Sequence, residues 1–69
     1  MFDNLIQKAG IRLRTGYNRY GMCIELWAKY EKGYGFFFAI VDNWDKTLDE
    51  VANFDTAFDL WNGYTKVAR

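Results

Sequence analysis

The chain has 69 residues, with nine Lys and Arg against nine Asp and Glu, and it contains no His, no Ser and a single Cys. A chain of this length forms one small domain (residues 1–69), which buries only about 60% of the surface that its unfolded form exposes. Without His or Ser the usual nucleophile and base pairs are absent, and one Cys allows neither a disulfide nor a zinc site. We therefore expect a protein that is not an enzyme and that holds no metal or cofactor.

Apolar residues with the spacing of a helical stripe open the chain: Phe2, Leu5, Ile6 and Ala9. Gly10 is placed to end this short N-terminal helix. The same segment has neither the basic start nor the apolar run of a signal peptide, which favours a cytoplasmic protein.

Three strands are predicted next, over residues 11–15, 22–30 and 34–41, and Gly16, Asn18 and Gly21 mark a loop or irregular hairpin between the first two. In the second strand the even-numbered residues 22–30 form one apolar face. Residues 31–33 (Glu-Lys-Gly) form a tight-turn sequence, so the second and third strands should be an antiparallel pair. The third strand is apolar on both faces, and with only three strands it can lie at an edge. Its second face, with Phe37, Ala39 and Val41, then needs a cover or a partner.

Thr47 and Glu50 have the spacing of a capping box and predict a helix from Leu48 to Gly63. Its apolar stripe is Val51, Phe54, Phe58 and Trp61, which leaves Leu60 on another side. Either the helix is continuous and Leu60 is exposed, or it breaks near residues 53–55 and Asp55 caps a second helix. The predicted fold is α+β, with a three-stranded antiparallel sheet between a short N-terminal helix and a C-terminal helix (α-β-β-β-α).

Acidic residues gather around one Trp in the second half of the chain, and we predict a partner-binding surface from Asp42, Trp44, Asp45, Asp49, Asp55 and Asp59. On a continuous helix Asp55 and Asp59 lie one turn apart. The spacing of these carboxylates does not match a calcium loop. A negative surface with an aromatic anchor suits docking on a basic, nucleic-acid-binding surface of a larger protein.

Two alternatives use the sheet instead. Aromatic and basic side chains of the strands indicate a single-stranded nucleic-acid binder, with contacts from Arg12, Arg14, Trp27, Lys29 and Phe37. The zero net charge weighs against this interpretation. The other alternative is a homodimer that covers the second face of the third strand.

The predicted element order is also that of double-stranded-RNA-binding domains, but residues 47–50 (Thr-Leu-Asp-Glu) stand where that family has a Lys-rich helix start. Acidic groups there would repel RNA, which excludes the family. In size, element order and acidic final helix, the chain resembles the small inhibitors that bacteriophages encode against host defence systems, anti-CRISPR proteins among them. The resemblance implies a protein-binding inhibitor that acts in the host cytoplasm.

Overall fold

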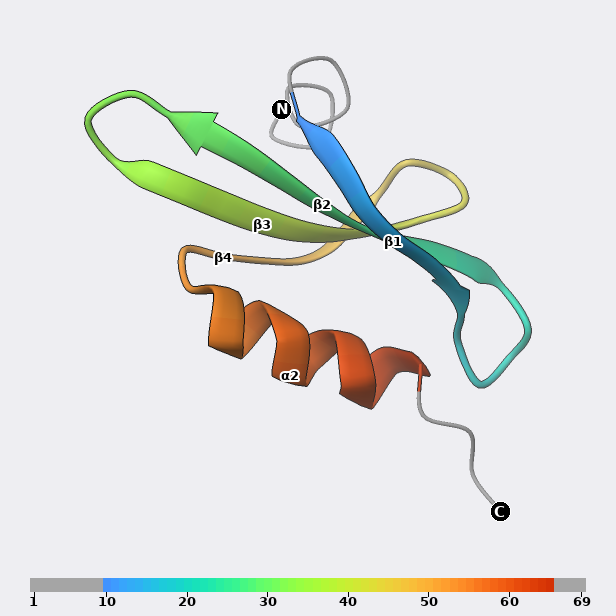
Figure 1. The fold of residues 1–69 in the computed structure, drawn as a ribbon. Coiled ribbons are helices and arrows are strands. Elements are labelled where there is room, and N and C mark those ends of the chain that lie inside the picture. Colours follow the sequence, from blue (N-terminus) through green and yellow to red (C-terminus); the bar gives the residue numbers. More distant parts are fainter. Residues whose placement is uncertain (1–9, 66–69) are drawn as a thin grey trace.

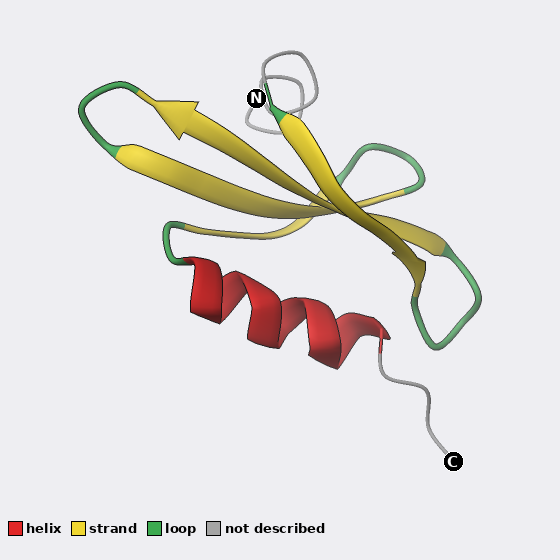
Figure 2. Cartoon of the chain, in the orientation of Figure 1, coloured by secondary structure: helices red, strands yellow, loops and turns green. Residues whose placement is uncertain are grey.

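The computed structural model describes residues 10–65, which form an antiparallel four-stranded sheet with one helix packed on it (Figures 1 and 2). The elements are β1 (Ile11–Tyr17), β2 (Cys23–Glu31), β3 (Gly35–Asp42), β4 (Thr47–Val51) and α2 (Phe54–Thr65). The strand order is β1-β2-β3-β4, so each strand pairs with its neighbours in the sequence. The α+β class and the antiparallel pairing of β2 with β3 are confirmed, whereas the helix predicted before Gly10 lies outside the described residues.

The fourth strand corrects the predicted three-stranded sheet. Residues 47–51, predicted as the start of the last helix, pair with β3, where Asp49 lies opposite Ile40 and Val51 lies opposite Phe38. The capping-box pattern is therefore not used. At a sheet edge, the N–H and C=O groups along one side of β3 would have no partner strand, although the strand is apolar on both faces. β4 provides the hydrogen-bond partners for these groups. Long-range pairing thus outweighs the local helix signal.

β3 is a central strand, not an edge. Phe38 and Ile40 are buried under α2, while Ala39 and Val41 are buried on the other side, where Trp27 packs on them. Ala39 and Val41 of this second face are already shielded from solvent within one chain, so the expected need for a further cover or partner there does not arise.

α2 begins at Phe54, and the side-chain Oδ1 of Asn53 accepts a hydrogen bond from the N–H of Thr56 (3.0 Å). Asn53 is therefore the N-cap, and a cap at Asp55 or a helix from Leu48 is ruled out. Nor does Gly63 end the helix, which continues to Thr65. Within residues 10–65, no helix has the length and apolar run that a membrane crossing needs.

The core lies between α2 and the adjoining face of the sheet. Its buried members are Ile24, Leu26, Ala28, Phe38, Ile40, Ala57 and Trp61. The alternation predicted for β2 is confirmed at residues 24, 26 and 28, but the helix buries Ala57 and Trp61 and leaves Phe54 exposed. Trp61 lies directly on β1: a Cβ added at Gly16 would be 3.0 Å from its Cζ2 atom. Gly16 is thus a strand residue that allows close packing, and not the loop residue that the sequence indicated.

Candidate functional site

The described residues line an open pocket of about 580 Å³ where the β1–β2 turn approaches β4 and α2. We call it the acidic pocket; its walls include Arg19, Tyr20, Asp49, Asp59, Leu60 and Tyr64. Two of the predicted partner-binding residues, Asp49 and Asp59, therefore meet here. They come together from a strand and a helix, and not along one helix as the sequence suggested.

The β1–β2 turn is fixed by Asn18. Its Oδ1 atom accepts hydrogen bonds from the N–H groups of Tyr20 and Met22, both at 2.9 Å, and its carbonyl accepts one from Gly21 (3.0 Å). Gly21 has a φ of 80°, which a glycine adopts without strain. These bonds hold Arg19 and Tyr20 at the pocket, and sequence reasoning recognised the turn without seeing that it reaches the last helix.

Tyr64 and Asp49 connect the helix to the sheet edge. The Tyr64 hydroxyl donates a hydrogen bond to Oδ2 of Asp49 (3.0 Å). Burial raises the pKa of Tyr64 above its ordinary value, and the hydrogen bond and the negative charge of Asp49 raise it further. The phenol therefore remains a donor at neutral pH, and its hydrogen bond holds the Asp49 side chain in place.

Asp59 is exposed on α2 and has no hydrogen-bond or ion-pair partner among residues 10–65. Arg19 is the basic side chain of the pocket wall, and it makes no ion pair with either carboxylate. Two carboxylates, the rings of Tyr20 and Tyr64, and the apolar side chain of Leu60 thus face one volume. Carboxylates beside aromatic rings are the groups that bind a guanidinium or ammonium ion.

The other members of the predicted acidic surface lie elsewhere. Asp55 is one helical turn before Asp59 and does not line the pocket. Asp42 is the last residue of β3, and Trp44 and Asp45 lie in the β3–β4 turn that follows. Oδ1 of Asp42 accepts hydrogen bonds from the N–H groups of Trp44 and Lys46, both at 2.9 Å. Asp42 therefore shapes a turn, and the exposed ring of Trp44 stands apart from the pocket.

The open face, which is the sheet face opposite α2, carries most of the alternative nucleic-acid set. The strand registers place Arg12, Trp27, Lys29 and Phe37 there. Arg14 is on the other face, because a bulge between residues 12 and 14 puts it opposite Leu26. Its guanidinium lies over the ring of Phe58, 5.1 Å from the centroid. The structure thus does not bring Arg14 to the predicted surface.

Carboxylates neutralise the basic groups of the open face. Arg12 pairs with Glu25 at 3.3 Å, the indole N–H of Trp27 donates to the same carboxylate (2.9 Å), and Lys29 pairs with Glu31. The Trp27 ring also packs on Ala39 and Val41. Neither the charge nor the ring is free in the way that a phosphate-binding, base-stacking surface requires.

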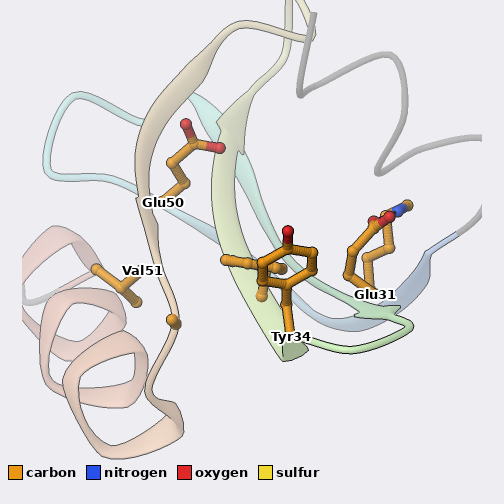
Figure 3. A pocket seen from close by; sticks show the side chains of 7 residues that line it. Glu31, Tyr34, Glu50 and Val51 are labelled. Carbon is orange, nitrogen blue, oxygen red and sulfur yellow. Dashed lines mark hydrogen bonds and ion pairs between the residues drawn. The ribbon is translucent and has the colours of Figure 1, made fainter.

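A second pocket, of about 520 Å³, lies on the open face (Figure 3). Glu31 and Tyr34 come to it from the β2–β3 hairpin, and Glu50 and Val51 come from β4. Lys29 is also in its wall and is paired with Glu31, so only Glu50 brings an uncompensated carboxylate from the described residues. The acidic pocket brings two, which makes it the stronger candidate for a cationic group.

Sequence reasoning missed a third feature, an exposed apolar surface on the helix side of the sheet beyond the start of α2. We call it the aromatic patch; its members are Ile11 (67% exposed), Tyr30 (61%), Phe36 (53%) and Phe54 (51%). Tyr30 and Phe36 are opposite each other in the β2–β3 pair, with ring centroids 5.2 Å apart. The alternation in β2 placed Tyr30 on the apolar face, but nothing in the sequence showed that the helix would stop short of it.

The described residues contain no group of three or more Cys, Asp or Glu side chains arranged to hold a metal ion. Cys23 is half-buried at the start of β2. No protein-family model matches the chain, and comparisons with curated proteins and with solved structures give no significant match. The geometry of the acidic pocket is therefore the basis on which a function can be argued.

Proposed function

We propose that this chain is a non-enzymatic protein-binding module whose acidic pocket receives a basic side chain from a larger partner. The observation that carries the proposal is the meeting of Asp49 and Asp59 in one aromatic-walled pocket, with Asp59 unpaired within residues 10–65. An unpaired carboxylate beside a fixed one offers two acceptors to a guanidinium, and charge-assisted bonds of this kind are the stronger ones.

The proposed consequence of binding is inhibition. Lys and Arg side chains that would enter the pocket are also those that contact phosphates on a nucleic-acid-binding protein, so both ligands would compete for them. The resemblance to phage-encoded inhibitors is in keeping with this role through size and through the acidic residues of the final helix, Asp55 and Asp59. The predicted element order, on which the resemblance also rested, differs from that of the described residues, because residues 47–51 form a strand.

The pairing of Arg12 with Glu25 and of Lys29 with Glu31 gives the alternative of a single-stranded nucleic-acid binder no support. Binding of a single-stranded oligonucleotide is a separate outcome of the titration described next.

The test is a titration of the ¹⁵N-labelled chain with an uncharged-terminus hexa-arginine peptide, with a hexa-glutamate peptide and with a single-stranded oligonucleotide, followed by amide chemical shifts. We expect shifts only with hexa-arginine, centred on residues 18–20, 49 and 59–64. Asp59→Asn should weaken this binding about tenfold, the effect of losing one charge-assisted bond. No binding of hexa-arginine, or shifts that map to the open face with the oligonucleotide, would overturn the proposal.

Asp55→Asn is the matched control, since it removes the same charge from the same helix one turn away and outside the pocket. It should change the affinity by about threefold or less, because an exposed carboxylate outside the pocket makes no direct bond to the bound guanidinium and interacts with it only weakly through water. Equal losses in the two variants would mean that the peptide responds to overall charge and not to the pocket.

Inhibition is tested with a bacterial lysate. Proteins retained by the immobilised wild-type chain and lost with Asp59→Lys should be basic, nucleic-acid-binding proteins, and the soluble chain should reduce their binding to nucleic acid. Retained proteins that bind their nucleic acid equally well with the chain present would contradict an inhibitory role.

A further inference from the structure

We propose that the aromatic patch is the interface with a second copy of this chain. The patch is separate from the acidic pocket: it is formed by Ile11, Tyr30, Phe36 and Phe54, and none of these lines that pocket. The proposal therefore stands or falls independently of the proposed function.

The patch exists because the helix is too short for the sheet. α2 has 12 residues and β2 has nine, which at ~1.5 Å and ~3.3 Å per residue gives about 18 Å of helix against about 30 Å of strand. Figure 1 shows the β2–β3 hairpin extending past the start of α2. The helix side of that hairpin therefore has no covering element among the described residues.

The rings form one continuous surface. Phe36 stacks against Phe38 (6.3 Å between centroids), Phe38 meets Phe54 edge-on (5.6 Å), and Phe54 stacks on Phe58 (6.0 Å). Phe38 is buried, so it anchors the two exposed neighbours to the core. The patch is thus rigidly held and is ready to pack without a large loss of side-chain entropy.

Its area fits a weak, reversible dimer. Three aromatic side chains of ~200 Å² that are about half exposed, together with Ile11, present about 400 Å². Patches of this size on a monomer are often functional, and a standard interface takes about 800 Å² from each partner. Two copies joined through this patch would bury about 800 Å² in total, which is about half of a standard interface, so we expect a weak and reversible association.

The charges beside the patch complement each other. Arg14 lies over Phe58 at one end of the stacked Phe54–Phe58 pair, and Asp55 follows Phe54 at the other. Neither side chain has an ion-pair partner in the described part of the chain. In a two-fold interface residue i meets residue j and j meets i, so Arg14 of each copy can pair with Asp55 of the other.

Other surfaces suit a second copy less well. The β1 edge is interrupted by the bulge between Arg12 and Arg14, and bulges and basic side chains are features that prevent edge-to-edge pairing. On the open face Ala39 and Val41 are already buried. The aromatic patch combines exposed apolar area with one unpaired cation and one unpaired anion, and this combination is complementary to itself.

The first experiment is sedimentation equilibrium of the chain from 10 μM to 1 mM. We expect the mass to rise from 8.2 kDa towards twice that value. Phe36→Glu should hold the chain monomeric throughout, and Tyr30→Glu, on the paired strand, should do the same. Trp44→Glu is the control, because it places the same charge at an exposed aromatic residue of the β3–β4 turn and should leave the association unchanged. Circular dichroism checks that each variant is folded.

A charge exchange tests the two-fold geometry. Arg14→Glu and Asp55→Arg should each weaken self-association at least about tenfold, since each brings like charges together twice. An equimolar mixture of the two variants should form a heterodimer to within about threefold of the wild-type affinity, because both pairs then have opposite charges.

A wild-type chain that stays monomeric at 1 mM overturns the proposal and leaves the patch to a different protein. Self-association that Phe36→Glu and Tyr30→Glu do not change also overturns it. If the mixture of Arg14→Glu and Asp55→Arg fails to associate, the Arg14–Asp55 pairing is wrong.

Discussion

The sheet is covered differently at the two ends of α2. At the C-terminal end the β1–β2 turn reaches the helix, and hydrogen-bonded polar groups with Tyr20 and Tyr64 surround the acidic pocket. At the N-terminal end the β2–β3 hairpin extends beyond the helix, and Tyr30, Phe36 and Phe54 are left as exposed rings. One end is suited to a charged ligand and the other to an apolar surface.

The difference shows what a very small domain can and cannot bury. A 12-residue helix covers only part of the sheet, so some apolar side chains stay outside whatever their type. Where the β1–β2 turn reaches the helix, polar groups cover that end of the sheet. Where the β2–β3 hairpin extends past the helix, its aromatic rings stay exposed. Position relative to the helix, more than residue type, therefore separates a core aromatic such as Phe38 from a patch aromatic such as Phe36.

The largest change in stability should come from Gly16→Ala, which disturbs the packing at the C-terminal end of α2. The added Cβ would be 3.0 Å from Cζ2 of Trp61 and 3.4 Å from Cγ2 of Thr65, and the buried Trp61 ring has little room to move. We expect a loss of about 1–3 kcal/mol of unfolding free energy, measured by urea denaturation. Binding of hexa-arginine should weaken while self-association is retained.

Gly63→Ala is the control for that loss, since nothing lies within 4 Å of the added Cβ and Ala favours a helix over Gly. It should stabilise the chain by about 0.5–1 kcal/mol. If Gly16→Ala is as stable as the wild type, the close approach of Trp61 to β1 is not a constraint on the fold.

The next effect should come from Asn53→Ala, at the other end of the helix. Loss of the cap bond to the N–H of Thr56 should cost about 1 kcal/mol of unfolding free energy. The first turn carries Phe54 and Asp55, so self-association should weaken while hexa-arginine binding stays nearly constant. Asn53→Asp, which preserves an acceptor at the cap, should behave as the wild type in both measurements, and a loss equal to that of Asn53→Ala would contradict the capping role.

The smallest effect should come from Tyr64→Phe, which removes the hydrogen bond to Asp49 at the acidic pocket. At pH 8 we expect a loss of about 0.5–1 kcal/mol of unfolding free energy. The pKa of Tyr64 is raised in the folded chain, so the folded state holds the phenolic proton more tightly than the unfolded state does. The stability that this group contributes is complete below pH about 10 and is lost as the pH rises through the folded pKa.

The wild type and Tyr64→Phe should therefore converge in stability above pH 10, as measured by urea denaturation of both at several pH values. A difference that stays constant to pH 12 would show that the phenol does not titrate with a raised pKa.

Parts of the fold and of the candidate site could be predicted because their cause is local. Period-2 alternation in β2 identified Ile24, Leu26 and Ala28 as one buried face, and the Glu-Lys-Gly turn at residues 31–33 identified the β2–β3 hairpin. Asp49 and Asp59 were both predicted as binding residues, and they do share a pocket. The route was wrong, because Asp49 reaches Asp59 from a strand.

The sequence by itself determined which residues alternate, which turn and which carry charge, since those properties depend on a few neighbouring residues. Only the tertiary structure decided that residues 47–51 pair with β3 and that a bulge places Arg14 on the face opposite to that of Arg12. It also decided that α2 does not cover Tyr30 and Phe36. Each of these depends on backbone pairing or on the lengths of elements far apart in the chain. The free energy of such contacts is set by the partner strand or helix, which no local pattern contains.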